Sequence, residues 1–165
     1  MEPKQGDPAL LREALAQELL NAAIPAHLAY VWSDGTPRVV PIWFHWTGEE
    51  IVLCSPPTAP KMKIMEGETP VALAIDYEQW PARSLEIRGT ATSEVVEGEV
   101  PEYAEITRKY LGEEGSREWR AQYGSMFPRP VRITVKPQWV ALIDVTTGRF
   151  PSAIDDAIAA AAATA

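Results

Sequence analysis

Hydrophobic residues recur with helical spacing near the start of the chain and with strand spacing soon after it. The segment 8–22, "PALLREALAQELLNA", follows an aspartate and repeats leucine and alanine every three or four positions, which predicts an amphipathic helix. Three apolar runs follow at 26–33, 37–46 and 50–55, separated by the turn-type sequences "DGTP" and "TGEE". Short apolar runs joined by tight turns indicate an antiparallel meander.

The second half of the chain adds three strand-like segments and an interrupted helix. Its strands are predicted over 69–77, 83–96 and 129–145. Gly89 suits a bend or bulge at a barrel corner, and a helical pattern over 99–123 is interrupted near Gly112 and Gly115. Six strands with few helices predict a mainly β protein with flanking helices, a six-stranded antiparallel barrel rather than a doubly wound α/β fold.

The length and charge of the chain limit its organisation and its partners. The 165 residues predict a single domain over 1–150, with an N-terminal helix, and an alanine-rich tail over 151–165 that is either a short helix or disordered. A net charge of −8 argues against nucleic acid or an anionic membrane as a partner. Because no apolar leader or membrane-spanning segment is seen, we expect a cytoplasmic protein.

Several common chemical signatures are absent from the sequence. Cys54 is the only cysteine and His27 and His45 are the only histidines, so we expect neither a disulfide framework nor a metal site. No glycine-rich dinucleotide fingerprint, phosphate-binding P-loop or H-E-x-x-H zinc motif occurs. A nucleophilic pair of Cys54 and His45 stays open, since their strands are predicted neighbours, but a buried hydrophobic role for Cys54 is favoured.

The run 37–46, "PRVVPIWFHW", is apolar on both faces. Strict alternation places one set of side chains together, namely Arg38, Val40, Ile42, Phe44 and Trp46, and the other set opposite, namely Val39, Pro41, Trp43 and His45. Such a strand fits a barrel wall with the core on one side and a subunit or a flat ligand on the other. Pro41 removes a hydrogen-bond donor, which indicates that the strand is unpaired on one side there.

The stretch after the strand 50–55 predicts an anion site. Thr58 is a plausible N-cap of a short helix that ends at Gly67, and Pro60 is tolerated in its first turn. Lys61 would then lie beside exposed backbone N–H groups, where a cation is unfavourable alone but cooperates with those groups if an anion is bound.

The run "DGTPRVVPIWFHWTGEEIVLCSPPTAPKMKIMEGETPVALAID", followed by "SLEIRGTA", resembles the FMN-binding split-barrel proteins related to pyridoxamine 5'-phosphate oxidase, including their deazaflavin-dependent reductase relatives. The resemblance extends from about Leu28 to Ala91. It implies a homodimer of split barrels that holds FMN, or the deazaflavin coenzyme F-420, at each subunit interface. It also supplies the anion expected near Lys61.

The resemblance assigns expected roles to ten residues. The strand that lies along the flavin ring and its ribityl chain corresponds to Arg38, Val39, Val40, Pro41 and Trp43. The phosphate is expected to contact Ser55 and Lys61, with Thr58 as a further donor, while Cys54 lines the same pocket. Ser84 occupies the position of a glutamine near the ring in the oxidases.

Several departures from the oxidases change what we expect of the site. Pro60 replaces an arginine before the phosphate lysine, which removes one charge-assisted contact and lowers the expected affinity for phosphate. Trp43 replaces a lysine that meets the substrate, and Ser84 replaces the glutamine near the ring. The last strand also lacks the arginine and histidine pattern of the oxidases. We therefore expect a substrate other than pyridoxamine phosphate.

These patterns together predict an FMN-dependent oxidoreductase that transfers hydride to or from a small apolar or aromatic molecule. The cofactor carries the chemistry, so no catalytic residue is assigned. FMN is preferred to coenzyme F-420 because the acidic tail of F-420 would require more basic residues than Lys61 and Lys63 provide. The alternatives are an F-420-dependent reductase, a non-catalytic flavin-binding protein, and a haem-binding protein with His45 as ligand.

Overall fold

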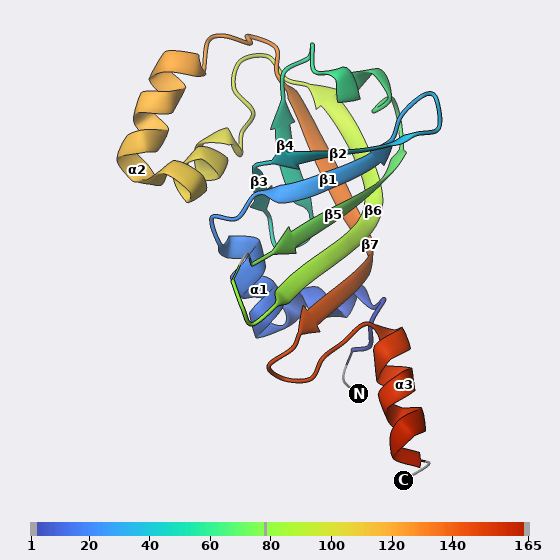
Figure 1. Ribbon diagram of the computed structural model, residues 1–165. Coiled ribbons are helices and arrows are strands. Elements are labelled where there is room, and N and C mark those ends of the chain that lie inside the picture. Colours follow the sequence, from blue (N-terminus) through green and yellow to red (C-terminus); the bar gives the residue numbers. More distant parts are fainter. Residues whose placement is uncertain (1–2, 78, 164–165) are drawn as a thin grey trace.

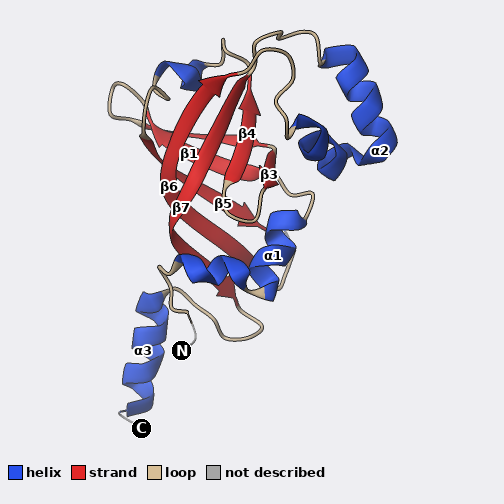
Figure 2. Cartoon of the chain, turned by 180° about the vertical axis from the view of Figure 1, so that it is seen from behind, coloured by secondary structure: helices blue, strands red, loops and turns tan. Residues whose placement is uncertain are grey.

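The computed structural model describes residues 3–77 and 79–163, apart from the side chains of residues 152 and 155. The centre of the fold is one antiparallel sheet that curves into a split barrel (Figure 1, Figure 2). Its strands are β1 (Ala26–Val31), β2 (Pro37–Ile42), β3 (Phe44–Trp46), β4 (Ile51–Ser55), β5 (Thr69–Asp76), β6 (Arg83–Val95) and β7 (Val131–Asp144). Its helices are η1 (Pro8–Arg12), α1 (Ala14–Asn21), η2 (Pro60–Lys63), α2 (Tyr103–Tyr123) and α3 (Ser152–Ala163).

The sheet has seven strands where six were predicted, because the run 37–46 divides in two. The strand order is β2-β1-β5-β6-β7-β4-β3, with every neighbouring pair antiparallel. Thus β2 and β3 form opposite edges of the sheet, although only Trp43 separates them in the chain. A sheet whose two edges are joined by one residue must curve back on itself. The split in the barrel therefore lies at Trp43.

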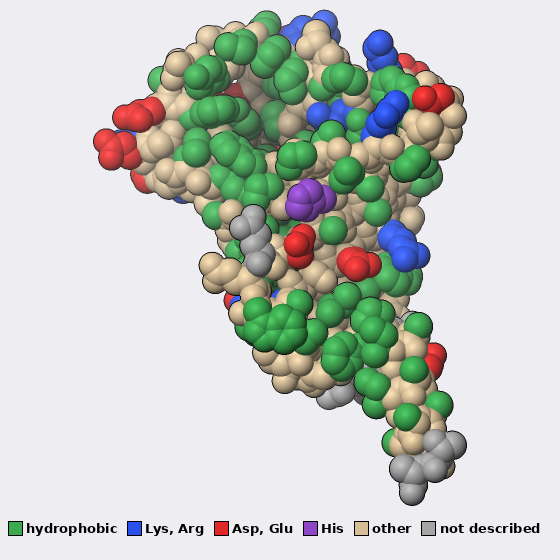
Figure 3. Space-filling view, in the orientation of Figure 1, with side chains coloured by type: hydrophobic (Ala, Val, Ile, Leu, Met, Phe, Trp, Pro, Cys, Tyr) green, Lys and Arg blue, Asp and Glu red, His purple; other side chains and the backbone are tan. Residues whose placement is uncertain are grey.

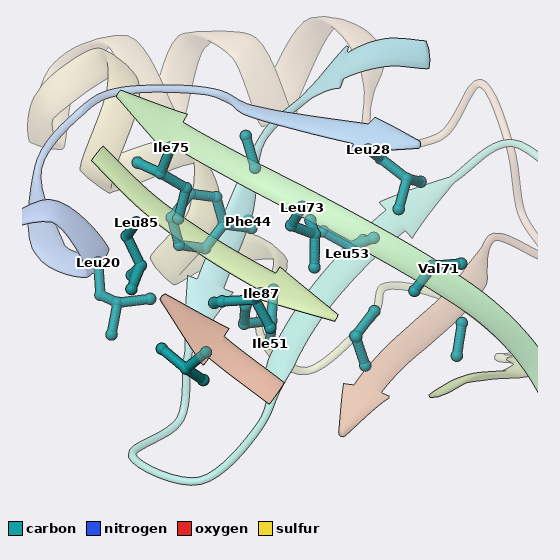
Figure 4. Close-up of a cluster of buried hydrophobic side chains, with 14 of the residues drawn as sticks. Leu20, Leu28, Phe44, Ile51, Leu53, Val71, Leu73, Ile75, Leu85 and Ile87 are labelled. Atoms are coloured by element: carbon teal, nitrogen blue, oxygen red, sulfur yellow. The ribbon is translucent and has the colours of Figure 1, made fainter. Parts of the chain in front are cut away.

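The barrel interior is filled by one apolar cluster to which nearly every strand contributes. Alternation predicted the inward side of 37–46 correctly: Phe44 is fully buried, and Val40, Ile42 and Trp46 pack against the same cluster. Figure 4 shows Phe44 among side chains from four other strands and α1, including Leu20, Leu53, Ile75, Leu85 and Ile87. Pro41 lies on an edge strand, as its missing N–H predicted.

Gly89 marks the predicted bulge. The register between β6 and β7 shifts between Arg88 and Gly89, and a Cβ on Gly89 would lie 2.2 Å from the Lys136 carbonyl oxygen. We expect Gly89→Ala to lower the free energy of unfolding by about 1–3 kcal/mol, because the backbone of β7 must move to admit the methyl group. Urea denaturation measures the change. Thr92→Ala, at an exposed position of the same strand, is the control and should change it by less than about 0.5 kcal/mol; equal losses would contradict this account.

Helices cover the end and the side of the barrel. The predicted helix 8–22 is broken by extended backbone at Glu13 into η1 and α1, both of which bury leucines against the barrel. The predicted interruption of α2 occurs at Gly112, whose φ is 73°. The helix α3 extends away from the barrel in Figure 1. Within the described residues, no helix combines the length and the hydrophobicity that crossing a membrane requires.

Candidate functional site

Aromatic side chains join α2 to the split in the barrel. The Trp43 ring stacks on Tyr110 of α2 with a centroid distance of 4.9 Å and an interplanar angle of 7°. It also contacts Trp119 at 5.7 Å, and Trp119 in turn contacts Tyr123 at 4.4 Å. In Figure 3, hydrophobic side chains gather where α2 faces the strands, and the surface is hollowed there. The flat surface expected at Trp43 is therefore covered on one side by the chain's own helix.

The first half of α2 is anchored to the barrel by two neighbouring residues. The Tyr110 hydroxyl donates to the Ile24 carbonyl at 3.1 Å and lies 3.4 Å from the Phe44 backbone N–H, which donates to it. The Lys109 ammonium donates to the Leu20 carbonyl at 2.7 Å and lies 3.4 Å from the centre of the Phe44 ring. Burial lowers the pKa of Lys109 to about 7, while the carbonyl and the ring face both favour its charged form.

Two neighbouring hollows lie between α2 and the strands. We call the first the Trp43 hollow; it has a volume of about 400 Å3 and is lined by Pro25, Pro41, Ile42, Trp43, Cys54, Tyr103, Ile106 and Trp119. We call the second the α2 pocket; it has a volume of about 390 Å3 and is lined mainly by Cys54, Ser55, Val100, Tyr103, Trp119, Tyr123, Met126 and Phe127. The two share Cys54, Tyr103 and Trp119, so they lie next to each other at the end of β4.

Several of the expected cofactor residues meet at this site. Pro41 and Trp43 line the Trp43 hollow, Ser55 lines the α2 pocket, and Cys54 lines both. Burial raises the pKa of the Cys54 thiol to about 11. A thiol that stays protonated at neutral pH is a poor nucleophile, which favours the interpretation of Cys54 as a pocket-lining side chain over the nucleophilic pair with His45.

The expected phosphate-binding residues lie close together, but the helix start is not as predicted. The helix η2 is a four-residue 3-10 turn whose N-cap is Ala59, with no side-chain hydrogen bond to the cap. The expected N-cap role of Thr58 is therefore wrong, and so short a turn adds little dipole to Lys61. Lys61 itself is half-buried, and burial lowers its pKa; no carboxylate of the described residues lies close enough to offset that effect.

The remaining expected residues lie apart from these two hollows. Val39 is 64% exposed on the outer side of β2, and Arg38 is exposed and pairs with Asp34 at 3.8 Å. Val40 instead packs against the core. Ser84 is the second residue of β6 and pairs with Asp76 of β5. It therefore lies at the end of β6 that is far from η2. Within one chain the structure does not bring Ser84 to Lys61.

Sequence reasoning overlooked the aromatic residues of α2. Tyr103, Trp119 and Tyr123 line the α2 pocket, and Tyr110 stacks on Trp43. The helical pattern over 99–123 predicted the helix but not the partners of its aromatic side chains. Their spacing of seven residues between Tyr103 and Tyr110, and of four between Trp119 and Tyr123, was the available signal of a buried side.

An ion pair fixes the start of α2 beside the site. The Arg132 guanidinium, on β7 opposite Cys54, donates to both oxygens of Glu102 at 2.6 and 2.9 Å, and each side chain is about four-fifths buried. The hydrogen bonds from Arg132 hold the pKa of Glu102 below its ordinary value. This stabilisation is present above the unfolded-state pKa of about 4.5 and is lost as the pH falls through the lower folded-state pKa.

We expect Glu102→Gln to destabilise the protein at pH 7 by an amount between the roughly 1 kcal/mol of an exposed pair and the 3–5 kcal/mol of a buried one. The difference from wild type should shrink as the pH falls from 4.5 through the lower folded-state pKa, because protonation first favours the unfolded chain and then removes the ion pair itself. Urea denaturation at pH 7 and at pH 3.5 measures both values. Glu97→Gln, in an exposed pair with Arg129, is the matched control. A deficit in Glu102→Gln that does not change with pH would contradict the assignment.

Comparison with known proteins identifies the fold. No protein-family model matches the chain, and no curated protein matches it in sequence. Among solved structures, a conserved hypothetical protein from Mycobacterium tuberculosis has a TM-score of 0.68 at 18% identity, covering 90% of this chain and 94% of that one. An F420 reductase has a TM-score of 0.55 at 25% identity, covering 76% and 94%. A proposed pyridoxamine 5'-phosphate oxidase from Listeria innocua has a TM-score of 0.51 at 22% identity, covering 78% and 91%.

These likenesses show that the chain has the split-barrel fold of the pyridoxamine 5'-phosphate oxidase-like proteins, which confirms the fold that the sequence predicted. The extra strand relative to the prediction reflects the division of 37–46 at Trp43.

Proposed function

We propose that the protein is an oxidoreductase that binds a flavin-type cofactor at the end of β4, with FMN as the first candidate. The observation that carries the proposal is the meeting of Pro41, Trp43, Cys54 and Ser55 around two neighbouring hollows. Lys61 lines neither hollow, but it lies near enough to Cys54, which lines both, that the charge of each affects the pKa of the other. Apolar hollows with a cation nearby suit the ring and the phosphate of a flavin mononucleotide.

The residues at the end of β4 fit a phosphate group. Lys61 is partly removed from water without a carboxylate partner, which is unfavourable unless an anion restores its charge balance. Among the described residues, the buried Ser55 hydroxyl donates only to the carbonyl of the adjacent Pro56, at 3.2 Å, so it can turn to a better acceptor. When bound, FMN would supply hydride transfer. Lys61 and Ser55 would hold it, while Pro41 and Trp43 would exclude water from its ring.

Coenzyme F-420 is the second candidate cofactor. The similarity to an F420 reductase, at 25% identity, favours it. The charge around η2 opposes it, because only Lys61 and Lys63 are available there for an acidic tail. The same hollow would hold either ring, so a direct comparison of affinities separates the two.

The proposal includes a homodimer in which a second copy covers the outer side of β1 and β2. Val31 and Val39 are 60% and 64% exposed there, which leaves apolar surface in water. They lie beside a shallow hollow of about 180 Å3 whose floor is formed by small side chains, Ala29, Ala72 and Ala74. A second copy would bury this surface and would bring its own residues to the open side of Pro41.

Titration of the purified protein with FMN and with coenzyme F-420, followed by visible absorbance, tests the cofactor assignment. We expect FMN to bind more tightly than F-420, and the FMN-loaded protein to be reduced by NADPH or another hydride donor. Light scattering tests the dimer, and a monomer of 18.2 kDa that binds cofactor fully would contradict it. Binding without reduction by any donor would favour a flavin carrier over an enzyme. Failure of both cofactors to bind would overturn the proposal.

A further inference from the structure

The α2 pocket is a mainly apolar hollow that is open to solvent at one edge. Its volume is about 390 Å3. Two of its lining side chains are large, apolar and exposed: Met126 is 57% exposed and Phe127 is 36% exposed. A volume of this size with an aromatic lining lies in the range of small-molecule sites.

The charged groups of the pocket are already neutralised. Glu99 is the only ionisable acidic side chain in its lining, and it accepts two hydrogen bonds from Arg120, at 2.5 and 2.9 Å. No lysine or arginine lines the pocket. Away from Ser55, where the phosphate of the proposed cofactor would lie, a charged ligand would therefore lose its hydration without gaining an opposite charge, so this part of the pocket selects against ions.

Tyr103 supplies one directional hydrogen bond at the junction of the pocket and the Trp43 hollow. Its hydroxyl accepts from the Trp119 indole N–H at 2.9 Å, and among the described residues no acceptor takes its own proton. Burial raises the pKa of Tyr103, which keeps that proton in place at neutral pH. The free O–H can therefore donate to an acceptor on a ligand.

We propose that the α2 pocket binds a flat, uncharged, aromatic molecule of about two fused rings that carries one hydrogen-bond acceptor, which the Tyr103 hydroxyl orients. The aromatic walls, Trp119 and Tyr123 from α2 with Phe127 beyond its end, supply flat apolar contact. The pocket shares Cys54, Tyr103 and Trp119 with the Trp43 hollow, so its occupant would lie next to the proposed place of the flavin ring. The role of the pocket as a substrate site rests on the proposed function. Ligand binding to the pocket can be tested separately from that function.

Isothermal titration calorimetry without flavin tests the proposal with three probes of similar size. They are α-tetralone, which is neutral and has a carbonyl acceptor, tetralin, which lacks the acceptor, and 1-naphthoate, which is charged. We expect α-tetralone to bind most tightly and 1-naphthoate at least about tenfold more weakly. Tyr103→Phe should weaken α-tetralone by about three- to tenfold and leave tetralin unchanged. Tyr77→Phe, which removes a hydroxyl bonded to Glu18 elsewhere, should change neither.

A second pair of variants tests the location. Met126→Asp places a carboxylate at the exposed edge of the pocket and should weaken both neutral probes by about tenfold. Ile158→Asp makes the same kind of change on α3, where 52% of the side chain is exposed, and should have no effect. If neither neutral probe binds, or if Met126→Asp has no effect on them, the pocket is not the site. Equal effects of Tyr103→Phe on α-tetralone and tetralin would overturn the role of the hydroxyl.

A separate FMN titration distinguishes the two proposals. FMN binding with no binding of α-tetralone would overturn the pocket proposal alone. Binding of α-tetralone without binding of FMN or F-420 would overturn the proposed function and leave a pocket for aromatic ligands.

Discussion

Replacing Lys61 with alanine is expected to weaken FMN binding by about ten- to a hundredfold and to leave riboflavin binding unchanged. The variant removes one charge-assisted hydrogen bond to the phosphate, worth roughly 1.5–3 kcal/mol, and riboflavin has no phosphate to lose. Equilibrium titration of both ligands, followed by flavin fluorescence, measures the two affinities.

The cofactor-free protein should respond to the same substitution in the opposite direction. Burial lowers the pKa of Lys61 in the folded protein, so folding disfavours its charged form at pH 7. Lys61→Ala removes that cost, and we expect the thermal midpoint without FMN to stay unchanged or to rise slightly. With saturating FMN, the wild type should have the higher midpoint, because it binds the ligand more tightly.

Lys63→Ala is the matched control, since Lys63 lies in the same short turn but is exposed. It should reduce FMN affinity much less than Lys61→Ala, as should Arg38→Ala, whose guanidinium is exposed and pairs with Asp34. An equal loss of FMN and riboflavin in Lys61→Ala would mean that Lys61 supports the fold and not the phosphate. A greater loss in Arg38→Ala would move the anion site to β2.

Phe44→Ala is expected to lower the free energy of unfolding by about 3–5 kcal/mol. The ring is fully buried where the chain passes from one edge of the sheet to the other, so its loss leaves a cavity that close-packed neighbours cannot fill. The substitution also removes the ring that faces the Lys109 ammonium, which anchors α2. Urea denaturation measures the change, and a fall of several degrees in the thermal midpoint should accompany it.

Phe127→Ala provides the control for the loss of a phenyl ring. Phe127 is 36% exposed and lines the α2 pocket, so its removal should cost clearly less stability than the removal of Phe44. Comparable losses in the two variants would show that the barrel core tolerates a cavity at the split. Phe44→Leu should recover much of the lost stability, because it refills most of the volume without restoring the ring.

The sequence by itself determined the barrel strands and which side chains of the segment 37–46 share a face. Alternation over 37–46 placed Phe44 inside and Pro41 outside, and Gly89 predicted the bulge that the structure has there. These features follow from local rules: side chains alternate along an extended strand, and only glycine admits a close backbone contact. The ordered motifs also sufficed to predict the split-barrel fold, which the solved structures confirm.

Tertiary structure alone decided how α2 contributes to the site. Its aromatic residues contact Trp43 or line a pocket with Cys54, and both of these residues lie some fifty to eighty positions earlier in the chain. The periodicity of a helix does not indicate which distant residues it will contact. The same limit explains the wrong N-cap at Thr58 and the division of 37–46. A four-residue turn is too short for capping preferences to fix its start, and only the pairing of β2 with β1 and of β3 with β4 breaks the strand at Trp43. Pairing between distant segments depends on the whole packed chain, and a local pattern cannot encode it.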